Sequence, residues 1–135
     1  MKIAKSTAGD RLYQIAKTLV IFGEWLVMRL DELEPKFLKL VHPKEWHNVE
    51  TIAEADGIRF LCPKCFTENS GPMGTHSVIC WQPTVPAEVR PAPGRWQFLG
   101  NGYRDLSLVA GSSSVQLNGG CQAHFFVENG AIRNA

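Results

Sequence analysis

The sequence has little that would indicate nucleic-acid binding, a membrane span or secretion. Lys and Arg number 14 and Asp and Glu 13, so the chain lacks the basic excess typical of nucleic-acid binding. Its most apolar stretch, residues 19–28, is interrupted by Gly23 and Glu24 and is shorter than the roughly 20 apolar residues that span a bilayer. Polar residues follow the basic start of the chain, which is unlike a secretory signal. We therefore expect a cytoplasmic protein.

Motifs for common catalytic sites are also absent from the sequence. It contains no H-E-x-x-H metalloprotease motif, no phosphate-binding P-loop, no G-x-G-x-x-G and no G-x-S-x-G elbow. It has no H-x-E triplet of the kind that zinc deaminases place before P-C-x-x-C. His42 and His47, on either side of Trp46, are candidates for acid–base chemistry, but no partner for them is evident. We predict no catalytic residue, and an enzyme is the less favoured class.

The composition is that of an ordinary globular protein. Of 135 residues, 44% are hydrophobic and 20% charged, which argues against disorder and against a coiled coil. A chain of this length buries roughly 68% of its unfolded surface as one domain. We expect a single domain over residues 1–135, with a helical segment over 1–40 and a metal-binding core over 42–133.

Two short motifs far apart in the chain carry potential metal ligands. Cys62 and Cys65 form a C-x-x-C pair, and Cys121 and His124 are also separated by two residues. In a reducing cytosol such pairs indicate metal binding more than disulfides. Three thiolates and one imidazole suit Zn²⁺ in a closed, structural, tetrahedral site. The sequence therefore predicts one zinc site made by Cys62, Cys65, Cys121 and His124.

Two further residues compete for a place in this site. His76 directly precedes the predicted strand Ser77–Trp81, which contains Cys80. In an extended chain, positions four apart point to the same face. Either one can replace one of the four predicted ligands. A buried, structural Cys80 is the alternative, since free cysteine is among the most buried residue types.

The predicted elements fall into a helical N-terminal part and a strand-rich remainder. Helical spacing predicts a first helix from about Asp10 to Leu33, stopped by Pro35. The alternative for its second half is a pair of strands, residues 20–22 and 25–28, around a turn at Gly23 and Glu24. A second helix is predicted between Pro43 and Gly57. The fold class expected is thus α+β, with N-terminal helices packed on an antiparallel sheet and a zinc knuckle joining the middle of the chain to the last strands.

Short apolar runs separated by glycine- and asparagine-rich turns predict this sheet. A proline-rich stretch over residues 83–93 has no periodicity and predicts an ordered, irregular loop. The predicted strands are Ile58–Leu61, Ser77–Trp81, Arg95–Leu99, Leu106–Val109, Ser114–Leu117, Phe125–Val127 and Ile132–Arg133.

Four segments, 56–66, 74–81, 94–96 and 119–127, resemble a family of small phage and prophage proteins that carry a domain of unknown function. Members are sometimes labelled "ammonia monooxygenase" through a naming error. The resemblance covers residues 42–133, and the paired Cys motifs are its most distinctive part. It implies a phage or prophage origin and a zinc site at Cys62, Cys65, Cys121 and His124, and it brings no established activity.

Together these features predict a phage accessory protein with a structural zinc site that binds another protein, from the phage or its host. The expected location is the cytoplasm of the bacterial host, or the virion. Two alternatives remain open, a zinc-dependent hydrolase and a nucleic-acid-binding, zinc-ribbon-like module; the near-neutral charge disfavours the second.

Overall fold

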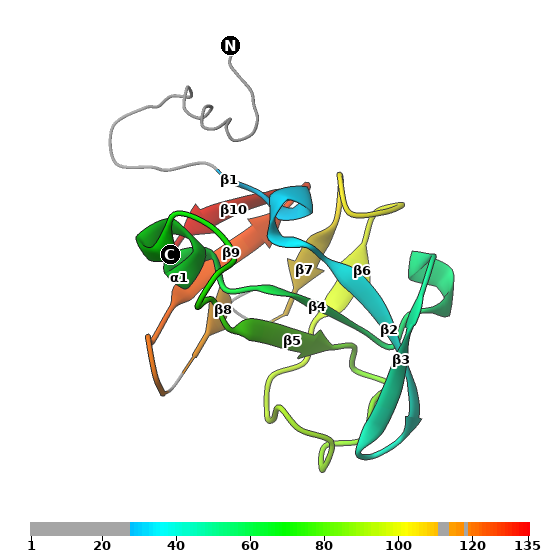
Figure 1. Cartoon of the computed structure of the whole chain (residues 1–135). Helices are drawn as coiled ribbons and strands as arrows, with labels where there is room; N and C mark the ends of the chain where they lie inside the picture. The colour runs from blue at the N-terminus through cyan, green and yellow to red at the C-terminus, as the bar shows by residue number, and fades with distance from the viewer. Residues whose placement is uncertain (1–27, 111–113, 118) are drawn as a thin grey trace.

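The computed structural model describes residues 28–110, 114–117 and 119–135. These residues form a predominantly β structure with one short α-helix and two 3₁₀ turns (Figure 1). The strands are β1 (Met28–Arg29), β2 (Lys36–His42), β3 (Glu45–Val49), β4 (Gly57–Leu61), β5 (Ser77–Trp81), β6 (Gln97–Leu99), β7 (Ser107–Val109), β8 (Ser114–Gln116), β9 (His124–Glu128) and β10 (Ala131–Asn134). The helix is α1 (Pro63–Asn69), and the 3₁₀ turns are η2 (Leu30–Leu33) and η3 (Ile52–Glu54).

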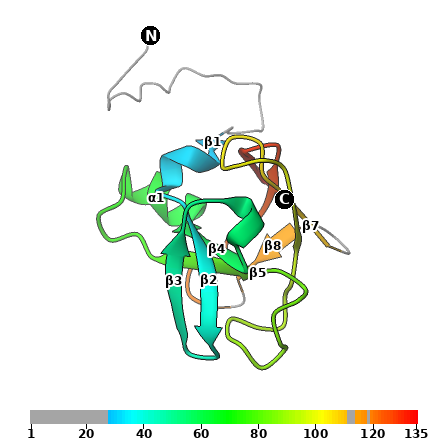
Figure 2. The same ribbon diagram turned by 90° about the vertical axis from the view of Figure 1, so that its right-hand side faces the viewer.

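The first sheet is antiparallel with the strand order β3-β2-β4-β5. Its hairpin β2–β3 is drawn as a long pair of strands beside the loop of residues 82–95 (Figure 2). Along β4, Ile58 and Phe60 are buried and Arg59 is half-exposed, the period of two expected of a strand with one face on a core. The predicted strands at Ile58–Leu61 and Ser77–Trp81 are therefore present.

The second sheet is antiparallel with the order β1-β10-β9-β8. Asn129 and Gly130, with φ of 50° and 77°, form the turn between β9 and β10, as the asparagine–glycine pair predicted. β6 and β7 form a separate two-stranded ribbon, whose Phe98 and Leu108 are buried in the same core.

The two sheets share one hydrophobic core. Phe60 of the first sheet meets Phe125 of the second edge-to-face, with ring centroids 6.0 Å apart. Such aromatic pairs add to the stabilisation that burial alone provides. A second, smaller cluster lies on the other side of the first sheet and consists of Leu38, Trp81, Val85 and Val89.

The backbone of the proline-rich segment is held by side-chain hydrogen bonds, most of them from one arginine. Arg95 donates hydrogen bonds to five backbone carbonyls, those of Val85, Pro86, Val89, Pro91 and Gly94. Trp81 Nε1 donates to the carbonyl of Arg90 at 2.8 Å. Because the prolines supply no N–H groups for a ladder, side-chain donors take over the role of holding this loop.

The predicted fold class α+β is wrong, because no N-terminal helix packs on a sheet in the described part of the chain. The first predicted helix lies outside the described residues over 10–27. Its last part forms β1 and η2, in which Met28 and Arg29 pair with Ile132 and Ala131 of β10. Residues 28–29 and 36–40 of the expected helical segment thus belong to the sheets, since strand pairing outweighs a helical spacing of apolar residues.

The second predicted helix is also wrong. Residues 43–57 contain the turn of the β2–β3 hairpin, strand β3 and the short turn η3. Trp46 of β3 packs edge-to-face on Trp81, with ring centroids 5.6 Å apart. This contact with a distant strand favours the extended conformation, and the local spacing of apolar residues does not reveal it.

None of the helices in the described residues is long and apolar enough to cross a membrane.

Candidate metal centre

The first two candidate ligands lie at the junction of β4 and α1. Cys62 follows the last residue of β4 and is the residue before the helix, and Pro63 occupies the first helical position, which its fixed φ favours. The Phe66 N–H donates to the Cys62 carbonyl at 2.9 Å, and Cys65 lies in the first helical turn. Cys62 is fully buried and Cys65 half-buried, so the strand end and the helix start aim both sulfurs at one point.

The third candidate, His76, directly precedes β5. Because β4 and β5 are antiparallel neighbours with Leu61 opposite Ser77, the next pair along the ladder is Cys62 and His76. The Cys62 N–H donates to the His76 carbonyl at 2.9 Å. The register of this strand pair therefore sets an exposed imidazole beside a buried thiol.

The fourth candidate, Cys121, comes from the turn between β8 and β9. Gly120 and Gln122 have φ of 58° and 56°, and the Gln122 N–H donates to the Gly119 carbonyl at 3.1 Å. Lys64 Nζ donates to the Cys121 carbonyl at 2.7 Å. This bond attaches the turn to the start of α1, so that Cys121 lies over the other two thiols.

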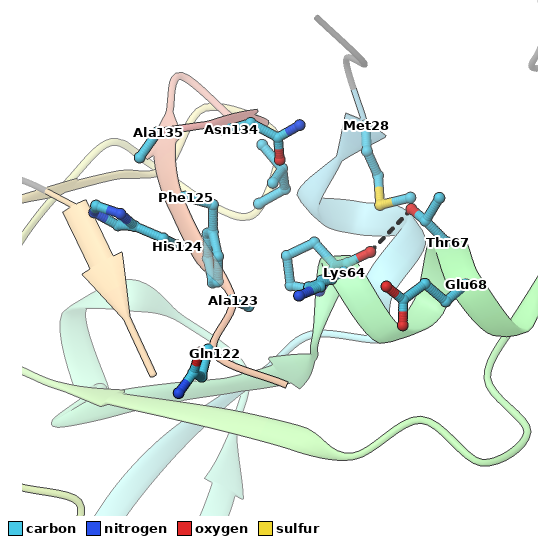
Figure 3. Close-up of a pocket in the computed structure, with 12 residues that line it drawn as sticks. Met28, Lys64, Thr67, Glu68, Gln122, Ala123, His124, Phe125, Asn134 and Ala135 are labelled. Atoms are coloured by element: carbon cyan, nitrogen blue, oxygen red, sulfur yellow. Dashed lines mark hydrogen bonds between the residues drawn. The ribbon is translucent and has the colours of Figure 1, made fainter. Parts of the chain in front are cut away.

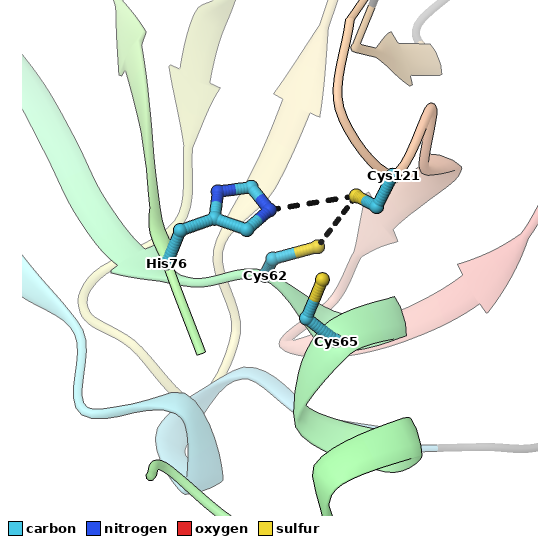
Figure 4. Close-up of side chains that lie close together, drawn as sticks. All are labelled: Cys62, Cys65, His76 and Cys121. Carbon is cyan, nitrogen blue, oxygen red and sulfur yellow. Dashed lines mark hydrogen bonds between the residues drawn. The ribbon is translucent and has the colours of Figure 1, made fainter. Parts of the chain in front are cut away.

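The four side chains converge in space (Figure 4). The Cys62 and Cys121 sulfurs are 3.6 Å apart, and His76 Nε2 is 3.4 Å from the Cys121 sulfur. All four ligand atoms lie within 4.8 Å of one another. The other ring nitrogen, His76 Nδ1, is 3.3 Å from the Ser77 carbonyl. When Nδ1 carries the proton and donates it there, the lone pair of Nε2 faces the thiols. This Cys3His group could hold a metal ion.

Ionisation of the three thiols is strongly interdependent. Burial, followed by the hydrogen bond with Cys121 and repulsion from Cys62, raises the pKa of Cys65 to about 12. Burial also raises the pKa of Cys62. At Cys121 burial disfavours the thiolate, but hydrogen bonds from His76 and the Ala123 backbone outweigh it and lower the pKa to about 7. Three thiolates in this space need a cation, because like charges this close disfavour one another's ionisation.

Three of the four sequence-predicted ligands are thus brought together, and the fourth, His124, is not part of the group. Strand alternation in β9 directs Ala123 and Phe125 into the core, whereas His124 is exposed. His124 lines a cavity of about 370 Å³ between α1 and the last strands (Figure 3). His76, which the sequence analysis considered as a replacement ligand, belongs to the group together with the three cysteines. The signal for it in the sequence was its proximity to the C-x-x-C pair and its place directly before the predicted strand Ser77–Trp81.

Other residues singled out in the sequence lie elsewhere. Cys80 is 1% exposed within the hydrophobic core, and burial raises the pKa of its thiol, as in a structural cysteine. His42 forms an exposed contact with Glu45, 2.8 Å between Nε2 and the carboxylate, near the turn of the β2–β3 hairpin. His47 is exposed on the same hairpin. Neither histidine belongs to the Cys3His group.

Comparisons of the chain with protein-family models, with curated proteins and with solved structures find no match.

Proposed function

We propose that Cys62, Cys65, His76 and Cys121 bind one Zn²⁺ ion in a closed, structural site. The spacing of the donor atoms carries this proposal. With Zn–S bonds of about 2.3 Å and a Zn–N bond of about 2.0 Å, tetrahedral coordination separates two sulfurs by about 3.8 Å and a sulfur and a nitrogen by about 3.5 Å. The sulfur–sulfur distance of 3.6 Å and the nitrogen–sulfur distance of 3.4 Å are close to both values.

The donor set favours zinc over harder cations. Thiolate and imidazole ligands select Zn²⁺, whereas Mg²⁺ and Ca²⁺ take oxygen ligands. Four protein ligands complete a tetrahedron, so no position remains for water or substrate, which is typical of structural sites. The ion supplies charge that keeps the thiols ionised, and the hydrogen bond at His76 Nδ1 fixes the ring.

Bound zinc would connect three segments that are distant in sequence. These are the β4–α1 junction, the start of β5 and the turn before β9. The first two belong to one sheet and the third to the other. The ion would therefore join the two sheets at one end of the shared core, closing a loop of more than 50 residues in the way that constrains an unfolded chain most.

The biological role that we propose is that of a zinc-stabilised module that binds another protein, in the cytoplasm of a bacterial host. A phage or prophage origin is proposed on the resemblance of the four segments alone. The partner-binding role is supported by a rigid β scaffold and by a ligand set with no open coordination position.

The ligand set is tested by zinc content and X-ray absorption of protein purified without added chelator. We expect one zinc per chain, with three sulfurs and one nitrogen in the coordination sphere. The variant His76→Ala should weaken zinc binding by about 10- to 100-fold or more, since it removes a ligand. His124→Ala is the matched control and should bind zinc as the unaltered protein does.

Two results would contradict this assignment. Zinc lost in His124→Ala and retained in His76→Ala would restore the ligand set read from the sequence. A coordinated water oxygen in the absorption spectrum would indicate an open site and favour the zinc hydrolase.

A further inference from the structure

A groove of about 590 Å³ lies between edge strands of the two sheets that the described residues form. One wall is β5, the edge strand of the first sheet, and the other is β8, the edge strand of the second. Figures 1 and 2 both show these two strands side by side. Residues 91–94 and Trp96 line the groove between them. Edge strands offer unpaired backbone groups to another chain. The backbone groups and side chains along both edges therefore determine which ligand the groove can bind.

The β5 edge directs backbone donors and acceptors into this groove. The Cys62 N–H donates to the His76 carbonyl, and the Gln82 N–H donates to the Asp56 carbonyl. In an antiparallel ladder hydrogen-bonded pairs alternate with non-bonded pairs. Given the register of Leu61 with Ser77, the residues of β5 that bond to β4 are 78 and 80.

The backbone groups of Ser77, Ile79 and Trp81 therefore point away from β4. The carbonyl of Trp81 accepts the Trp96 N–H at 3.0 Å, which occupies one end of the edge. The Ser77 carbonyl lies 3.3 Å from His76 Nδ1. The Ser77 N–H and both backbone groups of Ile79 remain directed outward along the groove.

The opposite wall has the same character. The Leu117 N–H donates to the Ala123 carbonyl, and Val115 lies opposite Phe125, so positions 115 and 117 bond to β9. The backbone N–H and C=O of Gln116 then point away from β9. Trp96 Nε1 donates to the Ser114 carbonyl at 3.3 Å, which holds the indole between the two edges.

The side chains of the groove are uncharged. Of the described residues that line it, none is Asp, Glu, Lys or Arg. Besides His76, a proposed zinc ligand, the lining is apolar, hydroxyl or amide. A charged occupant would lose its hydration here without gaining a partner, whereas an extended main chain gains hydrogen bonds to the edge and apolar contacts to the tryptophan and prolines.

We propose that this groove binds an extended, uncharged segment of another protein, whose main chain adds as a strand to the Ser77–Ile79 edge of β5. Side chains on one face of that segment contact Trp96, and its far edge meets the Gln116 wall. This is strand addition, in which main-chain hydrogen bonds give affinity and pockets for alternate side chains give specificity. The inference rests on the proposed partner-binding role and names its surface.

The probe is a set of random octapeptides displayed for selection on the zinc-loaded full-length protein. Selected sequences are expected to lack charged residues over at least four consecutive positions. A synthetic selected peptide should shift the amide signals of Ser77, Ile79 and Gln116 and the indole signal of Trp96, and should slow hydrogen exchange at the Ile79 amide. The same peptide methylated at alternate backbone nitrogens is the control and should lose binding, because it cannot form the ladder.

Proline variants test the edge directly. Proline is tolerated in an edge strand where the N–H faces outward, so Ser77→Pro and Ile79→Pro should each weaken peptide binding by about tenfold or more while leaving the β4–β5 ladder intact. Ser77→Thr and Ile79→Val keep the N–H and should bind as the unaltered protein does. Zinc content and thermal unfolding of each variant establish that it is folded.

Three outcomes would overturn the proposal. They are selection of no peptide by a zinc-loaded protein, mapping of selected peptides to another face, and equal binding by folded proline and control variants. If selected peptides bound another face, the proposed partner-binding role would remain, and only its assignment to this groove would be wrong. Concentration-dependent dimerisation abolished by Ile79→Pro would assign the edge to a second copy of this chain instead.

Discussion

At the scale of single residues, the position of one histidine decides the composition of the candidate metal centre. His76 and His124 are both exposed, and each lies next to a strand that reaches the site. What separates them is backbone register: His76 is bonded to Cys62 through its carbonyl, whereas His124 follows a buried alanine and faces the opposite way. The two-residue spacing between Cys121 and His124 does not reveal this difference in register.

Gly57 is a second position where a single atom matters. A Cβ added there would collide with the Trp81 ring and lie 2.9 Å from the Cys80 carbonyl oxygen. Gly57→Ala should destabilise the fold by about 1–3 kcal/mol, the usual cost of overpacking a filled site. The measurement is urea unfolding.

Gly102→Ala is the matched control, because nothing lies within 4 Å of its added Cβ. It should change stability by less than about 0.5 kcal/mol. Equal effects of the two substitutions would contradict the close approach of Trp81 to β4.

At the scale of elements, the proline-rich segment is ordered by hydrogen bonds from one guanidinium group. Five carbonyls accept from Arg95, and desolvation by burial lowers the pKa of this side chain. The planar fork of arginine supplies several donors in fixed directions, which lysine cannot reproduce. The segment in turn covers the cluster around Trp81.

Arg95→Ala should therefore destabilise the protein by about 1–3 kcal/mol, since part-buried carbonyls lose charged donors. Hydrogen exchange should become faster at the Val85 and Val89 amides, which close turns in this segment. Arg95→Lys should recover only part of the loss. Arg90→Ala, at an exposed position of the same segment, is the control and should have little effect on stability. If it destabilised the protein as much as Arg95→Ala does, the hydrogen bonds of the Arg95 guanidinium group would not be what holds the segment.

At the scale of the whole molecule, the candidate metal centre lies where the two sheets meet. The core includes many buried residues from both sheets, so the fold does not depend on the ion alone, in contrast to domains too small to form a core. Zinc should nevertheless add stability through mass action, by about 4 kcal/mol at a free concentration near 1,000 times the dissociation constant.

Removal of zinc by a chelator should lower the unfolding temperature and make it dependent on free zinc. Hydrogen exchange should accelerate first in α1 and in the turn of residues 119–122, which the centre joins to the β4–β5 pair. The amides of the β2–β3 hairpin, distant from the centre, provide the internal control and should change least. Unfolding that is independent of zinc over a wide range of concentrations would contradict a structural role.

The strands of the C-terminal half could be predicted from the sequence because their signals are local. Alternating burial and the turn at Asn129-Gly130 specify β9 and β10 over a few residues. In the described part of the first half, β4 was predicted from such local signals, but β1, β2 and β3 were not. β1 pairs with β10, about 100 residues away, and Trp46 is held by Trp81; contacts at such separation leave no trace in the periodicity of either partner.

The sequence by itself determined which chemistry is available here. It supplies three thiols and a histidine in short motifs, nearly balanced charges that do not favour nucleic acid, and turn residues that divide the second half into strands. Only the tertiary structure decided which histidine joins Cys62, Cys65 and Cys121, and which sheet edges remain open beside it. The physical reason is that a ligand's identity is a local property, whereas convergence of ligands and exposure of an edge depend on the register between strands that the chain brings together only on folding.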